Sequence, residues 1–76
     1  MVKYVMSPKI QYRQESFGGI AESCKTGLVV FNHEEYNKFL SFEKPLVKTE
    51  DDFINEPILA EFLKLGLIVE DASSFL

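Results

Sequence analysis

The side chains of this chain that could do chemistry are few, and the first to consider are its single cysteine, Cys24, and its single histidine, His33. A reactive thiolate needs nearby positive charge, and Cys24 has only Lys25 beside it in the sequence. His33 stands at the expected start of a helix, where the helix dipole disfavours a protonated imidazole. The sequence shows no third residue to orient the pair and no oxyanion donors. We therefore expect no catalytic residue, and we interpret Cys24 as a small strand hydrophobe and His33 as a surface residue.

Metal and cofactor sites are not indicated either. A single cysteine cannot hold an iron–sulfur cluster, and the acidic run 50–52 lacks the spacing of a calcium loop. Gly18-Gly19 is not followed by an expected helix, so it does not match a phosphate-binding loop. We expect this glycine pair to form a bulge or bend that lets two backbones approach closely. The sequence predicts no metal and no cofactor.

Length and charge narrow the class of protein. A chain of 76 residues with a single cysteine fits one small domain without disulfides, which favours a reducing, cytoplasmic location. The net charge of −4 and the scattered basic residues argue against nucleic acid. No apolar run is long enough to span a membrane. We place the domain at residues 1–72 and expect 73–76 to be a frayed tail or the start of a linker.

The elements that would position a site begin with strands. Apolar and polar residues alternate over 9–14, and two further strands are expected at 20–24 and 28–31. The tripeptide at 25–27 ends in glycine, which suits a hairpin turn with Gly27 left-handed. The pattern predicts a three-stranded antiparallel sheet.

Helices follow the sheet. Asn32 and Glu35 form a capping-box pattern, and Phe31 can pack on Tyr36 across the cap, which predicts a helix from His33 to about Phe42. Residues 49–56 are expected to form a single turn capped by Thr49, with apolar anchors at 53 and 54. A last helix is expected over 57–65, ended by a glycine at 66, with a short extended piece at 67–69. The fold class is therefore α+β, a three-stranded antiparallel sheet followed by a small helical bundle.

The strand at 28–31 shows an unusual pattern, because all four of its residues are apolar. An antiparallel sheet with one wet face normally alternates apolar and polar residues. Either Val29 and Phe31 meet other parts of the same domain, or the strand borders an open groove that accepts an extended peptide by strand addition. An exposed apolar edge strand promotes aggregation. The presence of one in this domain would therefore favour the interpretation that a peptide binds there.

The ordered combination of these features resembles a known family. The run Ile10-x-Tyr12-Arg13-x-Glu15-x-Phe17-Gly18-Gly19, the hairpin containing Gly27, the apolar strand and Asn32 are similar to the RiPP recognition element. This is the PqqD-like, winged helix-turn-helix-like domain that binds leader peptides of ribosomally synthesised, modified peptides, in the version found with radical SAM maturases. The resemblance covers residues 9 to 69 and is sharpest up to Phe42.

The resemblance implies a peptide-binding site and a non-enzymatic function. The leader would lie as an added strand between two walls, the strand residues Leu28, Val29, Val30, Phe31 and Asn32 and the last-helix residues Leu59, Ala60, Leu63 and Lys64. The domain would act as a peptide chaperone in natural product biosynthesis, presenting the precursor to a modifying enzyme, a radical SAM maturase that carries the cofactor. Two alternatives stay open: a winged-helix DNA-binding protein, disfavoured because Lys64 is the only basic residue of the last helix, and a structural N-terminal module of a larger maturase.

Overall fold

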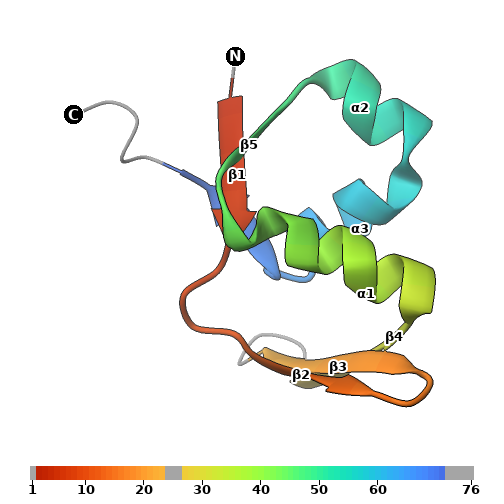
Figure 1. Ribbon diagram of the computed structural model, residues 1–76. Helices are drawn as coiled ribbons and strands as arrows, with labels where there is room; N and C mark the ends of the chain where they lie inside the picture. Colours follow the sequence, from red (N-terminus) through yellow and green to blue (C-terminus); the bar gives the residue numbers. More distant parts are fainter. Residues whose placement is uncertain (1, 24–26, 72–76) are drawn as a thin grey trace.

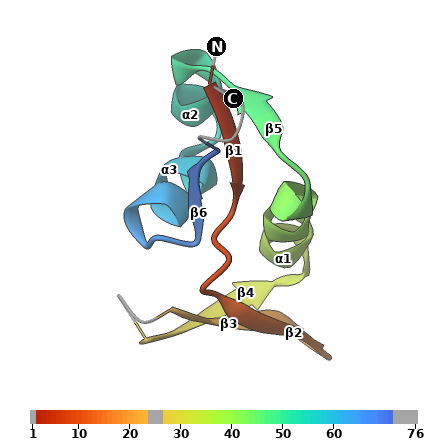
Figure 2. The ribbon, with the colours of Figure 1, turned by 90° about the vertical axis from the view of Figure 1, so that its left-hand side faces the viewer.

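The computed structural model describes residues 2–23 and 27–71. These residues form two three-stranded antiparallel sheets and three α-helices, so the predicted mixture of α and β structure is confirmed (Figure 1). One sheet has the strand order β2-β3-β4 and the other has the order β5-β1-β6. The helices lie between and beside the two sheets, and the β2-β3-β4 sheet forms one end of the molecule (Figure 2).

The first sheet matches the expected one. Its strands are β2 (Gln11–Glu15), β3 (Gly18–Ser23) and β4 (Gly27–Asn32). Gly27 has a φ of 80°, in the left-handed region, as predicted. The remainder of the predicted turn, together with Cys24, lies outside the described residues.

The register of this sheet decides which side chains share a face. Tyr12, Ala21 and Val29 lie opposite one another across the three strands, as do Arg13, Ile20 and Val30. Successive residues of a strand point to opposite faces, so these two rows lie on opposite sides of the sheet. Ala21 is almost completely buried, which identifies its row as the inner face. The row of Val30 is therefore on the outer face.

The chain leaves β4 directly into helix α1 (His33–Leu40), which is followed by a 3-10 turn, η1 (Ser41–Glu43). The predicted capping box is present, because the Asn32 side chain accepts a hydrogen bond from the Glu35 N–H at 2.8 Å and the Glu35 carboxylate accepts one from the Asn32 N–H at 2.9 Å. The rings of Phe31 and Tyr36 lie 6.1 Å apart across the cap. This cap fixes the direction in which α1 crosses the inner face of the first sheet.

The second sheet was not predicted. Its central strand is β1 (Val2–Met6), which pairs with β5 (Leu46–Lys48) on one side and β6 (Ile68–Glu70) on the other. The extended piece expected at 67–69 corresponds to β6. The helices are thus interleaved with short strands instead of following the first sheet as an uninterrupted bundle.

The last two helices end close to where the sequence places them. Helix α2 (Glu50–Asn55) starts at a capping box made by Thr49 and Asp52, and α3 (Pro57–Lys64) has its proline in the first turn. Gly66, with a φ of 76°, stands just beyond α3. The expectation that residues 53 and 54 both anchor α2 was half wrong. Phe53 packs edge to face on Tyr4 with ring centroids 5.2 Å apart, whereas Ile54 is 73% exposed.

The core is largely aromatic and joins the two sheets. Phe39 of α1 is fully buried, stacks on Phe31 at 5.1 Å and packs edge to face on Phe62 of α3 at 5.9 Å. Around these rings lie the other buried hydrophobic residues, Ala21, Tyr36, Phe42, Leu59, Leu67 and Ile68. Among the helices of residues 2–23 and 27–71, none combines the length and the apolar character needed to cross a membrane. The expected tail at 73–76, and the last residue of the expected domain, lie outside the described residues.

Candidate functional site

Strand β4 is at an edge of its sheet. Among the described strands it pairs only with β3, so no other described strand pairs with its second side. In a strand, the backbone N–H and C=O groups alternate between the two sides. Half of those in β4 therefore point away from β3, in the arrangement that an added strand uses.

The side chains of β4 divide between the two faces of the sheet. Phe31 is 3% exposed and Val29 is half-buried, and both belong to the inner face. Leu28 and Val30 are 61% and 62% exposed on the outer face. The two interpretations of the apolar strand therefore each apply to one face. The inner pair contributes to the core, while the outer pair stays in contact with solvent.

A shallow hollow adjoins the exposed pair. It has a volume of about 410 Å³ and lies over the middle of the first sheet. Its lining residues are Gln11, Tyr12, Arg13, Ile20, Glu22 and Leu28. Ile20 lies directly opposite Val30 across the strand pair, so the apolar surface of the edge extends inward onto β3. Arg13 forms an ion pair with Glu15, at 2.6 Å.

The structure does not bring the four residues of the predicted second wall together on one accessible surface. Leu59 is 2% exposed and belongs to the core. Ala60 and Leu63 line a different hollow, of about 410 Å³, shared with Tyr4, Glu50, Phe53 and Ile54. Lys64 is exposed at the end of α3. We correct the prediction accordingly: Ala60 and Leu63 face β1 and α2, not the first sheet.

Another face of α3 lies against the first sheet. Phe62 packs edge to face on Phe31 with ring centroids 5.8 Å apart, and the Ser23 hydroxyl donates to the Leu65 carbonyl at 3.4 Å. Ile58 shares a hollow with Asn32. Residues 58, 62 and 65 have the i, i+4, i+7 spacing of one helix face. The sequence placed Ile58, Phe62 and Leu65 in the apolar stripe of this helix but assigned none of them to the site.

A smaller hollow of about 250 Å³ lies at the C-terminal end of β4. It is lined by Asn32, Glu34, Glu35, Lys38 and Ile58. The Lys38 ammonium forms an ion pair with the Glu56 carboxylate at 2.5 Å, which joins α1 to the start of α3. The hydrogen bond between these two groups raises the pKa of Lys38 and lowers the pKa of Glu56. The end of the edge strand is therefore polar and carries more carboxylates than ammonium groups.

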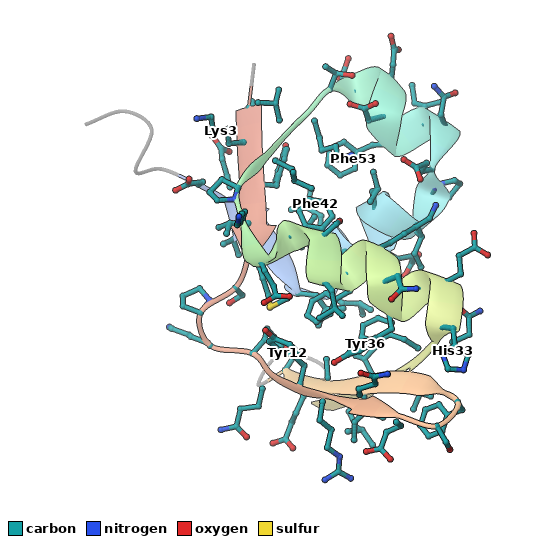
Figure 3. The ribbon with its side chains drawn as sticks, in the orientation of Figure 1. Lys3, Tyr12, His33, Tyr36, Phe42 and Phe53 are labelled. Atoms are coloured by element: carbon teal, nitrogen blue, oxygen red, sulfur yellow. The ribbon has the colours of Figure 1, made fainter. Side chains whose placement is uncertain are left out.

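The candidate residues for chemistry that the structure describes do not form a cluster. His33 is exposed at the first position of α1, and Cys24 is outside the described residues. Within 2–23 and 27–71, no group of three or more His, Cys, Asp or Glu side chains is arranged to hold a metal ion. The arrangement that the described residues do provide is an apolar strand edge with a hollow at one end that two glutamates and a lysine line. Figure 3 shows His33 at the start of α1 and Tyr36 between α1 and the first sheet.

Comparison with models of known protein families, with curated protein sequences and with solved structures finds no match for this chain.

Proposed function

We propose that the domain binds an extended peptide by strand addition to the outer side of β4. The observation that carries the proposal is the exposure of Leu28 and Val30, each above 60%, on a strand with no second described neighbour. Edge strands of soluble proteins are normally protected by charge, proline or a bulge. β4 has none of these between Gly27 and Asn32, so nothing in its sequence blocks the pairing of another strand with its free edge.

The peptide that we propose is the leader of a ribosomally synthesised precursor. This identification is based on the resemblance to the RiPP recognition element, whose motif residues lie in β2, β3 and the start of β4. In that family the domain is winged helix-turn-helix-like and the leader lies along the third strand of the sheet, which corresponds to β4. The accessible partner on α3 in this proposal is Ile58, which is half-buried and shares a hollow with Asn32, whereas Phe62 is buried in the core.

The domain would act without catalysis of its own. A bound leader makes the encounter of the attached core peptide with a modifying enzyme effectively intramolecular, which raises its local concentration. The modifying enzyme, a radical SAM maturase in the proposal, would supply its own iron–sulfur cluster. A single cysteine in this chain cannot hold one.

Proline substitutions in β4 test the site. Val29→Pro and Val30→Pro each remove one backbone donor, and only one of these two N–H groups points away from β3. The variant at the outward donor should fold and lose the leader, while the other should disturb the pairing of β4 with β3. The readout is calorimetric titration with the leader of a precursor encoded beside the gene, with circular dichroism as the check of folding.

A threonine at the outward-donor position is the matched control. It keeps the backbone donor and nearly the shape of valine, so it should weaken binding far less than proline does. Two proline variants that both stay folded and bind the leader as the parent does would show that β4 is not the pairing strand. A leader that does not bind the parent protein would overturn the assignment of the ligand.

A further inference from the structure

The outer face of the edge restricts which peptide it can hold. Leu28 and Val30 point to the same face, two residues apart. A guest strand beside β4 would place its own alternate side chains next to this pair. Cross-strand neighbours contribute most when both are apolar and β-branched or aromatic. The guest should therefore present two apolar side chains at positions i and i+2 on the outer face.

The inner face of the sheet restricts a third position of the bound peptide. The guest residue between those two would point toward the layer that holds α3, because Phe31 on that face already contacts Phe62. Ile58 and Leu65 are half-buried on the same side of α3 and leave apolar surface there. A polar guest residue at this position would lose its water without gaining a partner. Three consecutive apolar residues suit the middle of the site.

Charge gives the guest a direction. Glu34 and Glu35 line the hollow at the Asn32 end of β4, and the only lysine there, Lys38, is already paired with Glu56. All strand pairs of this sheet are antiparallel, so an added strand that continues the pattern has its N-terminal end beside Asn32. Glu35 already accepts a hydrogen bond from the Asn32 N–H, and Glu34 lies within the electrostatic reach of Lys38, but three carboxylates share one ammonium group here, so a basic residue at that end of the guest would be attracted.

The geometry points to a basic-apolar recognition sequence: an extended segment in which a lysine or arginine precedes three consecutive apolar residues, bound antiparallel to β4. This inference rests on the proposed function and specifies the class of peptide that the site accepts. The two parts have separate causes, since the apolar part depends on Leu28 and Val30 and the basic part depends on Glu34 and Glu35.

Three blocked synthetic peptides test it: acetyl-Lys-Thr-Val-Leu-Val-Thr-amide, the same peptide with Glu in place of Lys, and acetyl-Thr-Val-Leu-Val-Thr-Lys-amide. Titrations are followed through the backbone amide resonances of ¹⁵N-labelled protein. Shifts should concentrate in Leu28 to Asn32. The first peptide should bind about two- to fivefold more tightly than either of the others, the range expected for an exposed ion pair.

A pair of protein variants isolates the charge. Glu34→Gln and Glu50→Gln each remove one carboxylate from the first turn of a helix, the first at the end of β4 and the second in α2, far from the sheet (Figure 1). Only Glu34→Gln should reduce the preference for the first peptide. Equal binding of the three peptides, with shifts in β4, would overturn the basic-apolar sequence and leave strand addition standing. An absence of shifts in β4 with every peptide would overturn both.

Discussion

A methyl group added at Gly19 would collide with the buried ring that supports β4. Gly19 pairs with Phe31 of that strand, and a Cβ built on Gly19 would lie 2.2, 2.4 and 2.5 Å from three carbons of the Tyr36 ring. Tyr36 is 5% exposed, with the rings of Phe31 and Phe39 at centroid distances of 6.1 and 6.4 Å. The ring therefore cannot turn aside without moving its neighbours.

The expected cost follows from two opposing terms. Overpacking a well-packed core costs typically about 1–3 kcal/mol, and contacts this short belong to the upper part of that range. Replacing a strand glycine by alanine raises the free energy of unfolding by roughly 0.5–1 kcal/mol, because the chain then loses less conformational entropy on folding. Gly19→Ala should therefore lower the free energy of unfolding by about 2 kcal/mol, a large share of the roughly 3–5 kcal/mol expected for a core of this size.

Urea unfolding followed by far-ultraviolet circular dichroism measures the effect, since the chain has no tryptophan. The decisive comparison is Gly19→Ala in a Tyr36→Leu background, where the missing ring leaves room for the methyl group. The cost there should fall below about 0.5 kcal/mol, which gives a coupling energy above about 1 kcal/mol. Gly27→Ala is a second control. A Cβ at Gly27 meets nothing within 4 Å. The free energy of unfolding of Gly27→Ala should therefore fall by only about 1 kcal/mol, because alanine is strained in the left-handed conformation.

The same loss of stability in the two backgrounds would show that the Tyr36 ring is not what excludes a side chain at Gly19. A Gly19→Ala protein as stable as the parent would show that β3 and α1 do not approach as closely as the structure has them. Because β4 forms its hydrogen bonds to β3, the first result would also remove the reason for regarding the glycine as a support of the binding edge.

Other perturbations have simpler outcomes. Asn32→Ala removes the cap of α1 and should lower the free energy of unfolding by about 1 kcal/mol in urea titrations, and an unchanged midpoint would contradict the cap. Lys38→Gln should lower the urea midpoint at pH 7, and the difference from the parent should shrink as acid protonates Glu56. The reason is that a Glu56 whose pKa is lowered in the folded state contributes its full stabilisation above the ordinary pKa of a glutamate and loses it as the pH falls through the lowered pKa. A difference that persists at pH 2 would assign the effect to packing. The helical circular dichroism should survive chelator and reductant together, and its collapse would reveal a metal or disulfide requirement.

The first sheet and the caps could be predicted because their signals are local. The capping box at Asn32 needs only the residues from 32 to 35, and the staple joins Phe31 to Tyr36, five positions later. Each of these interactions is encoded by neighbours in the chain. The glycine pair could be assigned to close backbone approach for the same reason, although the sequence does not identify Tyr36 as what it approaches.

The second sheet depends on contacts between distant parts of the chain. β1 pairs Val2 with Lys48 and Met6 with Ile68, across more than 40 residues in each case. The outer strands, β5 and β6, have three residues each, too few to show a period of two. An extended piece at 67–69 could be expected, but no short-range pattern indicates that it pairs with β1 or that 46–48 is a strand. The strand character of all three arises from their mutual pairing.

The orientation of α3 explains why the sequence placed Ala60 and Leu63 beside β4, although they face β1 and α2. The stripe of α3 is broad, with Ile58 and Leu63 about 140° apart around the helix at 100° per residue. When an apolar stripe is this wide, the residues in its middle can be buried whichever of its two sides is turned toward the first sheet. The choice is made by the second sheet and α2, which occupy the side of Ala60 and Leu63, while Ile58 shares a hollow with Asn32 of β4 and the Leu65 carbonyl accepts a hydrogen bond from Ser23 of β3. The strand half of the site follows from local sequence, whereas the helix half requires the strands that the sequence does not reveal. A substitution meant to alter the helix side of the proposed peptide site therefore belongs at Ile58, and changes at 60 and 63 serve as controls.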